Sequence, residues 1–140
     1  MKMHNVKIIT NNPSVRTRYP EVAVFLDTGV EGVLITVRNM VHTGSSIVSH
    51  PLSGGMLPGE NPYKSLLMAQ TDSSGTGSVD IKSLELIENA LRLLRRTPEN
   101  FKGFDDASLE DFQALDLDFM VSALSGSHLA PLSHRDNRLL

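Results

Sequence analysis

Short runs of branched apolar residues alternate along the chain with longer segments whose apolar residues recur every three or four positions. The runs at 6–10, 22–26, 46–49 and 65–70 have the length and composition of β-strands, the second of them of the buried type. The segments between and after them have helical spacing. This alternation predicts an α/β fold: a small three-layer domain with an at least partly parallel sheet of about four strands, flanked by helices.

Helices are predicted over residues 13–19, 30–43, 79–96 and 108–124. The first is short and basic; Asn12 is placed to cap it and Pro13 suits its first position. Asp27 is a candidate cap for the second helix, and Gly44 is its natural stop.

The last predicted helix is acidic. Ser108 followed by Asp111 resembles a capping box at its start. Four apolar residues are expected to dock it on the domain: Phe112, Leu115, Phe119 and Met120. We expect a loop over 71–78, a stop at Pro98, one domain over residues 1–125 and a flexible tail over 126–140.

Composition narrows the class of protein. The chain has 140 residues, a net charge of -3 and no cysteine, which excludes disulfides, thiolate catalysis and Cys-ligated metal. There is no basic stripe and no apolar run of about 18 residues, so neither a nucleic-acid partner nor a membrane span is expected. The start has no signal-peptide pattern, which predicts a cytoplasmic protein. The five histidines show no ligand spacing, so neither a metal site nor a cofactor is expected.

The segment from Ser49 to Ser65 holds the candidate chemistry. It follows a strand and is dense in proline and glycine, which fix a loop in a particular shape at a conformational cost. Ligands of α/β sheets bind beyond the carboxyl ends of strands. That rule gathers polar residues from the ends of three predicted strands, namely Asn11, Asn12, Asp27, His50 and Ser53.

We therefore predict a site for a small polar or anionic ligand, or for a partner's peptide, formed by Asn11, Asn12, His50, Ser53, Gly54, Tyr63 and Lys64. His50 is a candidate general base, a donor to an anion, or a residue that pins the Pro51 turn. Gly54 with Gly55 can form a backbone nest for an anion. Lys64 either brings positive charge to the rim or is simply solvated, and Tyr63 either covers the pocket or fills a gap.

These residues also carry a family resemblance. The segments Ile9–Pro13, His50–Gly54 and Pro62–Ser65, with Pro58 and Glu60, resemble the GrdX family of small proteins associated with glycine, sarcosine and betaine reductase systems. The resemblance covers about residues 6–96, and the chain departs from the family pattern at Ser49, Gly55 and Leu57. It implies a cytoplasmic accessory protein of reductive amino-acid metabolism. The partners it implies are reductase-system proteins, with self-association as a further possibility.

Two other functions stay open. In the first, the protein is an enzyme on a carboxylate or phosphate substrate, with His50 as acid/base and Lys64 stabilising negative charge. In the second, the acidic helix over 108–124 is an interaction module that binds a reductase subunit or a second copy of the chain. A binding role is favoured over catalysis, because no carboxylate lies at motif spacing from His50.

Overall fold

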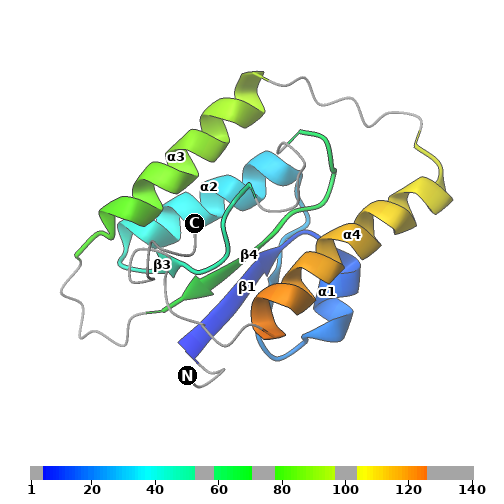
Figure 1. The fold of residues 1–140 in the computed structure, drawn as a ribbon, viewed down its shortest axis with the longest axis horizontal. Coiled ribbons are helices and arrows are strands. Elements are labelled where there is room, and N and C mark those ends of the chain that lie inside the picture. Colours follow the sequence, from blue (N-terminus) through cyan, green and yellow to red (C-terminus); the bar gives the residue numbers. More distant parts are fainter. Residues whose placement is uncertain (1–4, 53–58, 71–77, 97–103, 126–140) are drawn as a thin grey trace.

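A computed structural model describes residues 5–52, 59–70, 78–96 and 104–125. Within these ranges four helices flank one four-stranded sheet (Figure 1). The α/β prediction is thus confirmed. In chain order the elements are β1 (Val6–Thr10), α1 (Pro13–Arg18), β2 (Ala23–Phe25), α2 (Val30–His42), β3 (Ser46–Ile47), β4 (Ser65–Ala69), α3 (Ile81–Arg96) and α4 (Asp106–Ser125).

The sheet is mixed, with strand order β2-β1-β4-β3. β1 is parallel to β2, while β4 is antiparallel to both β1 and β3. Strands β1, β2 and β3 consequently finish at the same end of the sheet, and β4 begins there. We call this the site end. Among the described residues with a predicted ligand role, Asn11 and Asn12 follow β1, His50 comes shortly after β3, and Tyr63 and Lys64 precede β4.

Successive strand residues point to opposite faces, and this alternation divides the core in two. Ile9, Leu66 and Met68 pack with α2 and α3 on one face. Ile8 and Leu67 pack with α1 and α4 on the other. Figure 1 shows α2 and α3 together on one side of the strands, and α1 and α4 on the other. The predicted three-layer arrangement follows from this strand pattern.

Local signals fix two helix ends as predicted. The side chain of Asn12 accepts a hydrogen bond from the Ser14 N–H, and Pro13 occupies the first turn of α1. After α2, Gly44 has φ of 108°, which favours glycine, and the Ser45 N–H reaches back to the Met40 carbonyl at 3.0 Å. This pair of features is a Schellman end, and it turns the chain into β3.

Three expectations are corrected at element boundaries. The run over 22–26 was expected to be buried, but β2 is a short edge strand and Val24 is 37% exposed. Asp27 is not the N-cap of α2. Gly29 occupies that position, so no side chain caps the helix start. Helix α3 begins at Ile81 rather than at residue 79.

Helix α4 differs from its prediction in start and in rotation. It begins at Asp106, and the carboxylate of Asp105 accepts the Ser108 N–H at 2.8 Å, so no Ser108–Asp111 capping box forms. Met120 is buried as expected, whereas Leu115 is 48% exposed and Phe119 is 37% exposed. The prediction misjudged the phase because apolar residues lie on both sides of this helix.

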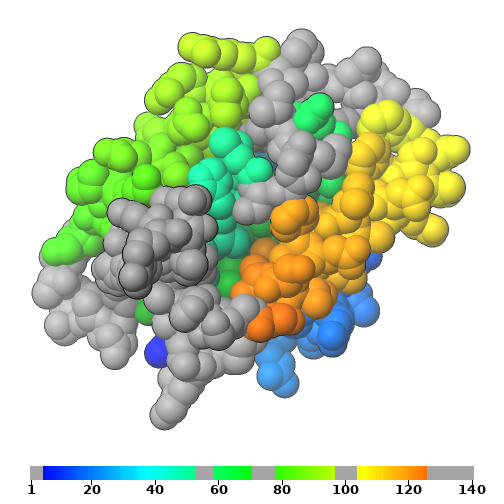
Figure 2. Space-filling view, viewed as in Figure 1, coloured from blue at the N-terminus to red at the C-terminus, as the bar shows by residue number. Residues whose placement is uncertain are grey.

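Three expected features lie outside the described residues: the greater part of the 71–78 loop, the stop at Pro98 and the tail over 126–140. No helix in the described ranges is long and apolar enough to cross a membrane. Figure 2 shows α4, in yellow to orange, at the molecular surface.

The rotation of α4 can be tested with two truncations on one helix. Met120→Ala removes a buried side chain and should lower the free energy of unfolding by about 2–5 kcal/mol. Leu115→Ala alters an exposed side chain and should change it by no more than about 0.5 kcal/mol. Urea denaturation measures both values. Equal losses of unfolding free energy in the two variants would contradict the observed rotation of α4 about its axis.

Candidate functional site

A buried carboxylate lies at the centre of the site end. Asp116 of α4 is 7% exposed and accepts three hydrogen bonds. Its Oδ1 accepts the Ser65 N–H at 3.1 Å, and its Oδ2 accepts the Ser65 hydroxyl at 2.6 Å and the Asn12 side-chain amide at 3.0 Å. These donors replace the water that the carboxylate loses on burial, and they join α4 to β4 and to the start of α1.

Two hydroxyl groups extend this network across the sheet. The Thr10 and Ser65 hydroxyl oxygens lie 2.6 Å apart, and Thr10 Oγ1 also accepts the Asn12 N–H at 2.9 Å. Each hydroxyl has a single hydrogen, and that of Ser65 is donated to Asp116. Thr10 therefore donates to Ser65. The result is a directional chain of donors from the Asn12 backbone to the carboxylate, in which each bond polarises the next.

Asn11 has a framework role on the neighbouring side. Its side-chain amide donates to the carbonyls of Thr28 and Pro62 at 2.9 and 3.0 Å. Its side-chain oxygen accepts the Lys64 N–H at 2.8 Å. The predicted ligand residues Asn11 and Asn12 are thus both at the site end, and both use their side-chain amides to hold protein segments together.

Tyr63 is tied to α4 through Gln113. The Gln113 side-chain amide donates to the Tyr63 hydroxyl at 3.0 Å, and the Ser14 hydroxyl donates to the Gln113 side-chain oxygen at 2.8 Å. Asn61 adds a further link, since its amide donates to the Phe112 carbonyl at 3.2 Å. The 61–65 segment is therefore held between β1 and α4.

His50 follows β3 and is exposed. Its Nδ1 accepts the Leu52 N–H at 3.0 Å, so in the neutral imidazole the proton is on Nε2. Nε2 is then a hydrogen-bond donor to anything outside the turn. Partial burial, together with the charges of Lys64 and Lys82, lowers the pKa of His50 and favours this neutral form.

Lys64 brings a positive charge to the site end, and Asp116 offsets only part of the cost of burying it. The Lys64 side chain is partly buried, and burial lowers its pKa, against the opposing attraction of Asp116. In the described ranges no hydrogen bond or ion pair involves its ammonium group. The positive charge of Lys64 is, after burial, the next cause of the lowered His50 pKa. Together Lys64 and His50 present an ammonium and an imidazole N–H.

The structure thus brings Asn11, Asn12, Tyr63, Lys64 and His50 to one end of the sheet. Ser53 and Gly54 lie outside the described residues. The sequence analysis did not predict a role at the site for Asp116 or Gln113. One signal for Asp116 was present: it stands four residues before Met120, on the face that a docking helix buries.

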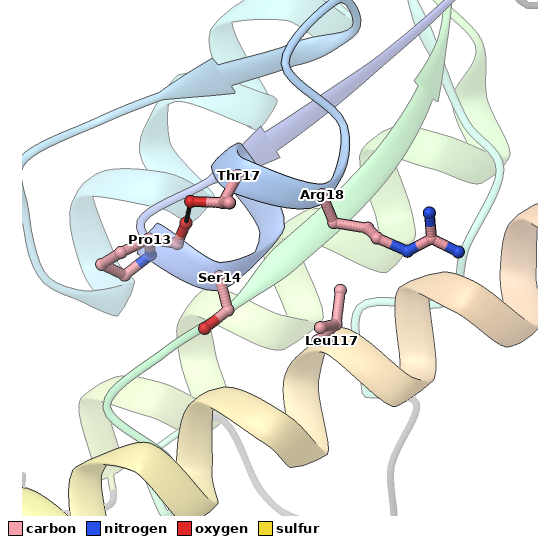
Figure 3. Close-up of a pocket in the computed structure, with 5 residues that line it drawn as sticks. All are labelled: Pro13, Ser14, Thr17, Arg18 and Leu117. Atoms are coloured by element: carbon pink, nitrogen blue, oxygen red, sulfur yellow. Dashed lines mark hydrogen bonds between the residues drawn. The ribbon is translucent and has the colours of Figure 1, made fainter.

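Two concavities on the described surface lie away from His50 and Lys64 and are less suited to an anion. An open depression of about 540 Å³ lies between α1 and α4, lined by Pro13, Ser14, Thr17, Arg18 and Leu117 (Figure 3). Its hydroxyls are already used, since Thr17 donates to the Pro13 carbonyl and Ser14 to Gln113. The described residues contain no group of three side chains that would hold a metal ion.

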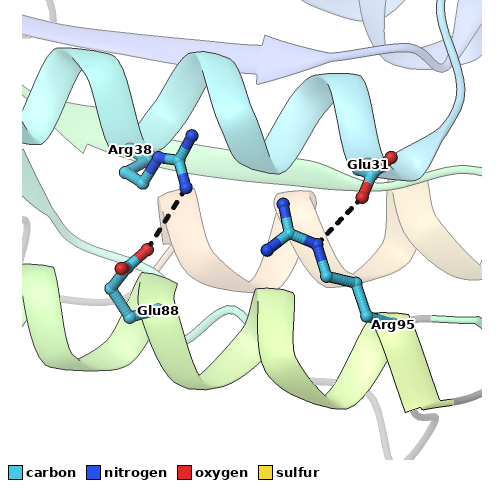
Figure 4. A network of polar contacts seen from close by, with 4 residues as sticks. All are labelled: Glu31, Arg38, Glu88 and Arg95. Carbon is cyan, nitrogen blue, oxygen red and sulfur yellow. Dashed lines mark hydrogen bonds and ion pairs between the residues drawn. The ribbon is translucent and has the colours of Figure 1, made fainter.

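A second concavity lies along α3 and includes Arg92, Arg95 and Arg96. There Arg95 pairs with Glu31 at 3.1 Å, and nearby Arg38 lies 3.6 Å from Glu88 (Figure 4). These exposed pairs join α3 to α2 and contribute little stability each. This arginine cluster is thus partly engaged within the protein, in contrast to Lys64.

Comparison with known proteins adds a family relationship. The family model described as GrdX-like protein matches residues 7–125, which is most of the chain. The match includes α4, beyond the 6–96 region in which the sequence motifs were recognised. No curated protein and no solved structure matches the chain.

The Asp116 network makes a prediction about stability. Asp116→Asn replaces an acceptor oxygen by an amide, which leaves at least one buried donor unpaired. The free energy of unfolding should fall by about 2–3 kcal/mol. Asp118→Asn on the exposed side of the same helix should change it by less than about 0.5 kcal/mol. Denaturant melts of both variants provide the measurement, and indistinguishable midpoints would contradict the network's role.

The proximity of His50 and Lys64 can be measured by NMR titration of the imidazole. The His50 pKa should lie below the ordinary value of 6.5, Lys64→Met should raise it, and Lys7→Met should leave it unchanged. The unfolded chain binds this proton more tightly than the folded protein. His50 therefore makes the free energy of unfolding decrease as pH falls from about 6.5 through the lowered pKa. A His50 pKa insensitive to Lys64→Met would rule out this electrostatic interaction.

Proposed function

The chain belongs to the GrdX-like protein family, and on that premise we propose that it is a cytoplasmic accessory protein of reductive amino-acid metabolism. Its partners are glycine, sarcosine or betaine reductase systems, as the sequence resemblance implies. Its own biochemical task is to hold a small anionic ligand, or an anionic group of a partner peptide, at the site end of the sheet.

One observation carries the ligand proposal: within the described residues, no hydrogen bond or ion pair involves the partly buried ammonium group of Lys64. Burial destabilises this charge more than Asp116 stabilises it, and a bound anion would reduce that penalty. The Nε2–H of His50 is a second donor close by. In this proposal Ser53 supplies a hydroxyl donor and Gly54 a backbone N–H donor to the anion. Tyr63 forms a wall of the binding site.

Asn11 and Asn12 have a supporting role in this proposal. They fix the backbone on either side of the ligand-binding groups rather than contacting the ligand through free amides. Lys64 is held at its own N–H by Asn11, and the next residue, Ser65, is held by Asp116. A rigid backbone under a free ammonium group is the arrangement that a preorganised anion site requires.

The hydrogen bond of His50 favours binding over acid/base catalysis. A general base needs an unprotonated nitrogen directed at the substrate. Here the unprotonated nitrogen, Nδ1, is occupied by the Leu52 N–H, and the outward Nε2 carries the proton. The imidazole is therefore a donor to a ligand in this conformation, and it gains a proton only by releasing the turn.

A thermal-shift series with phosphate, acetate and glycine tests the site. At ten times Kd a bound anion should raise Tm by about 3–6 °C in the wild type, measured against chloride at equal ionic strength. His50→Ala combined with Lys64→Met should abolish the shift without unfolding the protein. The control Lys82→Met, which removes an exposed lysine near His50, should retain more than half of it.

His50→Gln separates binding from catalysis. Its side-chain amide preserves a donor near the Nε2 position, so it should retain most of the anion-induced shift while lacking any acid/base capacity. If the double variant keeps the wild-type shift, the anion site is wrong. If a carboxylate or phosphate substrate is turned over and His50→Gln erases that turnover, the enzymatic alternative replaces the binding proposal.

A further inference from the structure

Helix α4 has an apolar stripe of which two side chains are left exposed. Phe112, Leu115 and Phe119 follow one another at three- and four-residue steps and so share one side of the helix. Leu115 is 48% exposed and Phe119 is 37% exposed, while Phe112 is partly buried and stacks at 5.3 Å on Phe104. The face that docks on the sheet is the neighbouring one, which carries Asp116 and Met120. Phe112, four residues before Asp116, lies at the border between the two faces.

The stripe has a negatively charged rim. Asp111 and Asp118 lie one turn before and one turn after Leu115, and both are exposed. Asp106 and Glu110 extend the negative charge toward the start of the helix. Helix α4 has no Lys or Arg along its length, so no cation of its own helix offsets these carboxylates.

Apolar side chains at this spacing are how a helix is recognised by another amphipathic helix. A contiguous exposed apolar patch with a polar rim marks an interaction surface, because its burial against a partner is favourable. The rim decides the kind of partner. Two copies of α4 laid against each other would place Asp111 and Asp118 near like charges, which disfavours self-association. A partner with lysine or arginine beside its apolar residues would pair with the rim.

We infer that the outer stripe of α4 (Phe112, Leu115 and Phe119, with the rim of Asp111 and Asp118) is a docking surface for a basic amphipathic helix of another protein. This surface is distinct from the anion site, because Asp116 and Gln113 reach the site end from another side of the helix. It gives the accessory protein a second binding surface, and binding of a partner there does not require an anion at Lys64.

Peptide binding to the full-length protein tests the inference. The probe is a synthetic 18-residue peptide of leucine and lysine with Leu at helical i, i+3, i+4 and i+7 spacing, followed by fluorescence anisotropy. We expect saturable binding that maps to α4 in NMR spectra. Leu115→Glu combined with Phe119→Glu should weaken it at least tenfold, and Asp111→Asn combined with Asp118→Asn should reduce its salt dependence. The exposed control Ala114→Glu should stay within twofold of wild type.

Four outcomes would overturn the inference. Equal binding of a leucine–glutamate peptide would show that the surface does not select for positive charge. Equal binding of an isomer with scrambled leucine positions would show that it does not recognise helical spacing. Unchanged affinity in the Leu115→Glu, Phe119→Glu variant would place binding elsewhere. A dimer detected by light scattering and dissolved by that same variant would make a second copy of the chain the occupant. Loss of anion binding at Lys64 would leave this inference intact, so the two proposals fail separately.

Discussion

The structure depends on one buried carboxylate. Asp116 enters the domain from α4 and meets donors from β4 and from the turn after β1, segments that are far apart in sequence. A carboxylate in that position requires several donors at fixed places, because an unpaired buried charge is strongly unfavourable. Its requirements therefore set the rotation of α4, the seating of the 61–65 segment and the geometry of the cap on α1.

That constraint divides the polar residues of the site end into two groups. Thr10, Asn11, Asn12 and Ser65 have their side chains committed to the protein itself. Lys64 and His50 are adjacent to this framework, and within the described residues no hydrogen bond involves the Lys64 ammonium or the Nε2 of His50. The framework supplies rigidity, and the two remaining groups supply a donor and a positive charge. The proposed anion site rests on this division of roles.

Much of the fold could be predicted from the sequence because its signals are local. The cap at Asn12, the stop at Gly44 and the apolar runs of the strands each follow from a few neighbouring residues. The convergence of strand ends was also predictable, since it follows from the alternation of strands and helices. The rotation of α4 was not. Both of its faces carry apolar residues, and only the long-range demand of Asp116 for Ser65 and Asn12 selects the buried one. The use of the Asn11 and Asn12 amides within the framework has the same long-range origin.

The proposed anion site requires that His50 offers an N–H near Lys64, and the tautomer of the imidazole is the sharpest check of that requirement. Long-range ¹H–¹⁵N NMR reports which ring nitrogen is protonated, in the free protein and after saturation with phosphate. We expect protonated Nε2 and unprotonated Nδ1 in the free form, with the Nε2 resonance shifting as phosphate binds. A proton on Nδ1, or an Nε2 resonance unmoved by phosphate, would contradict it.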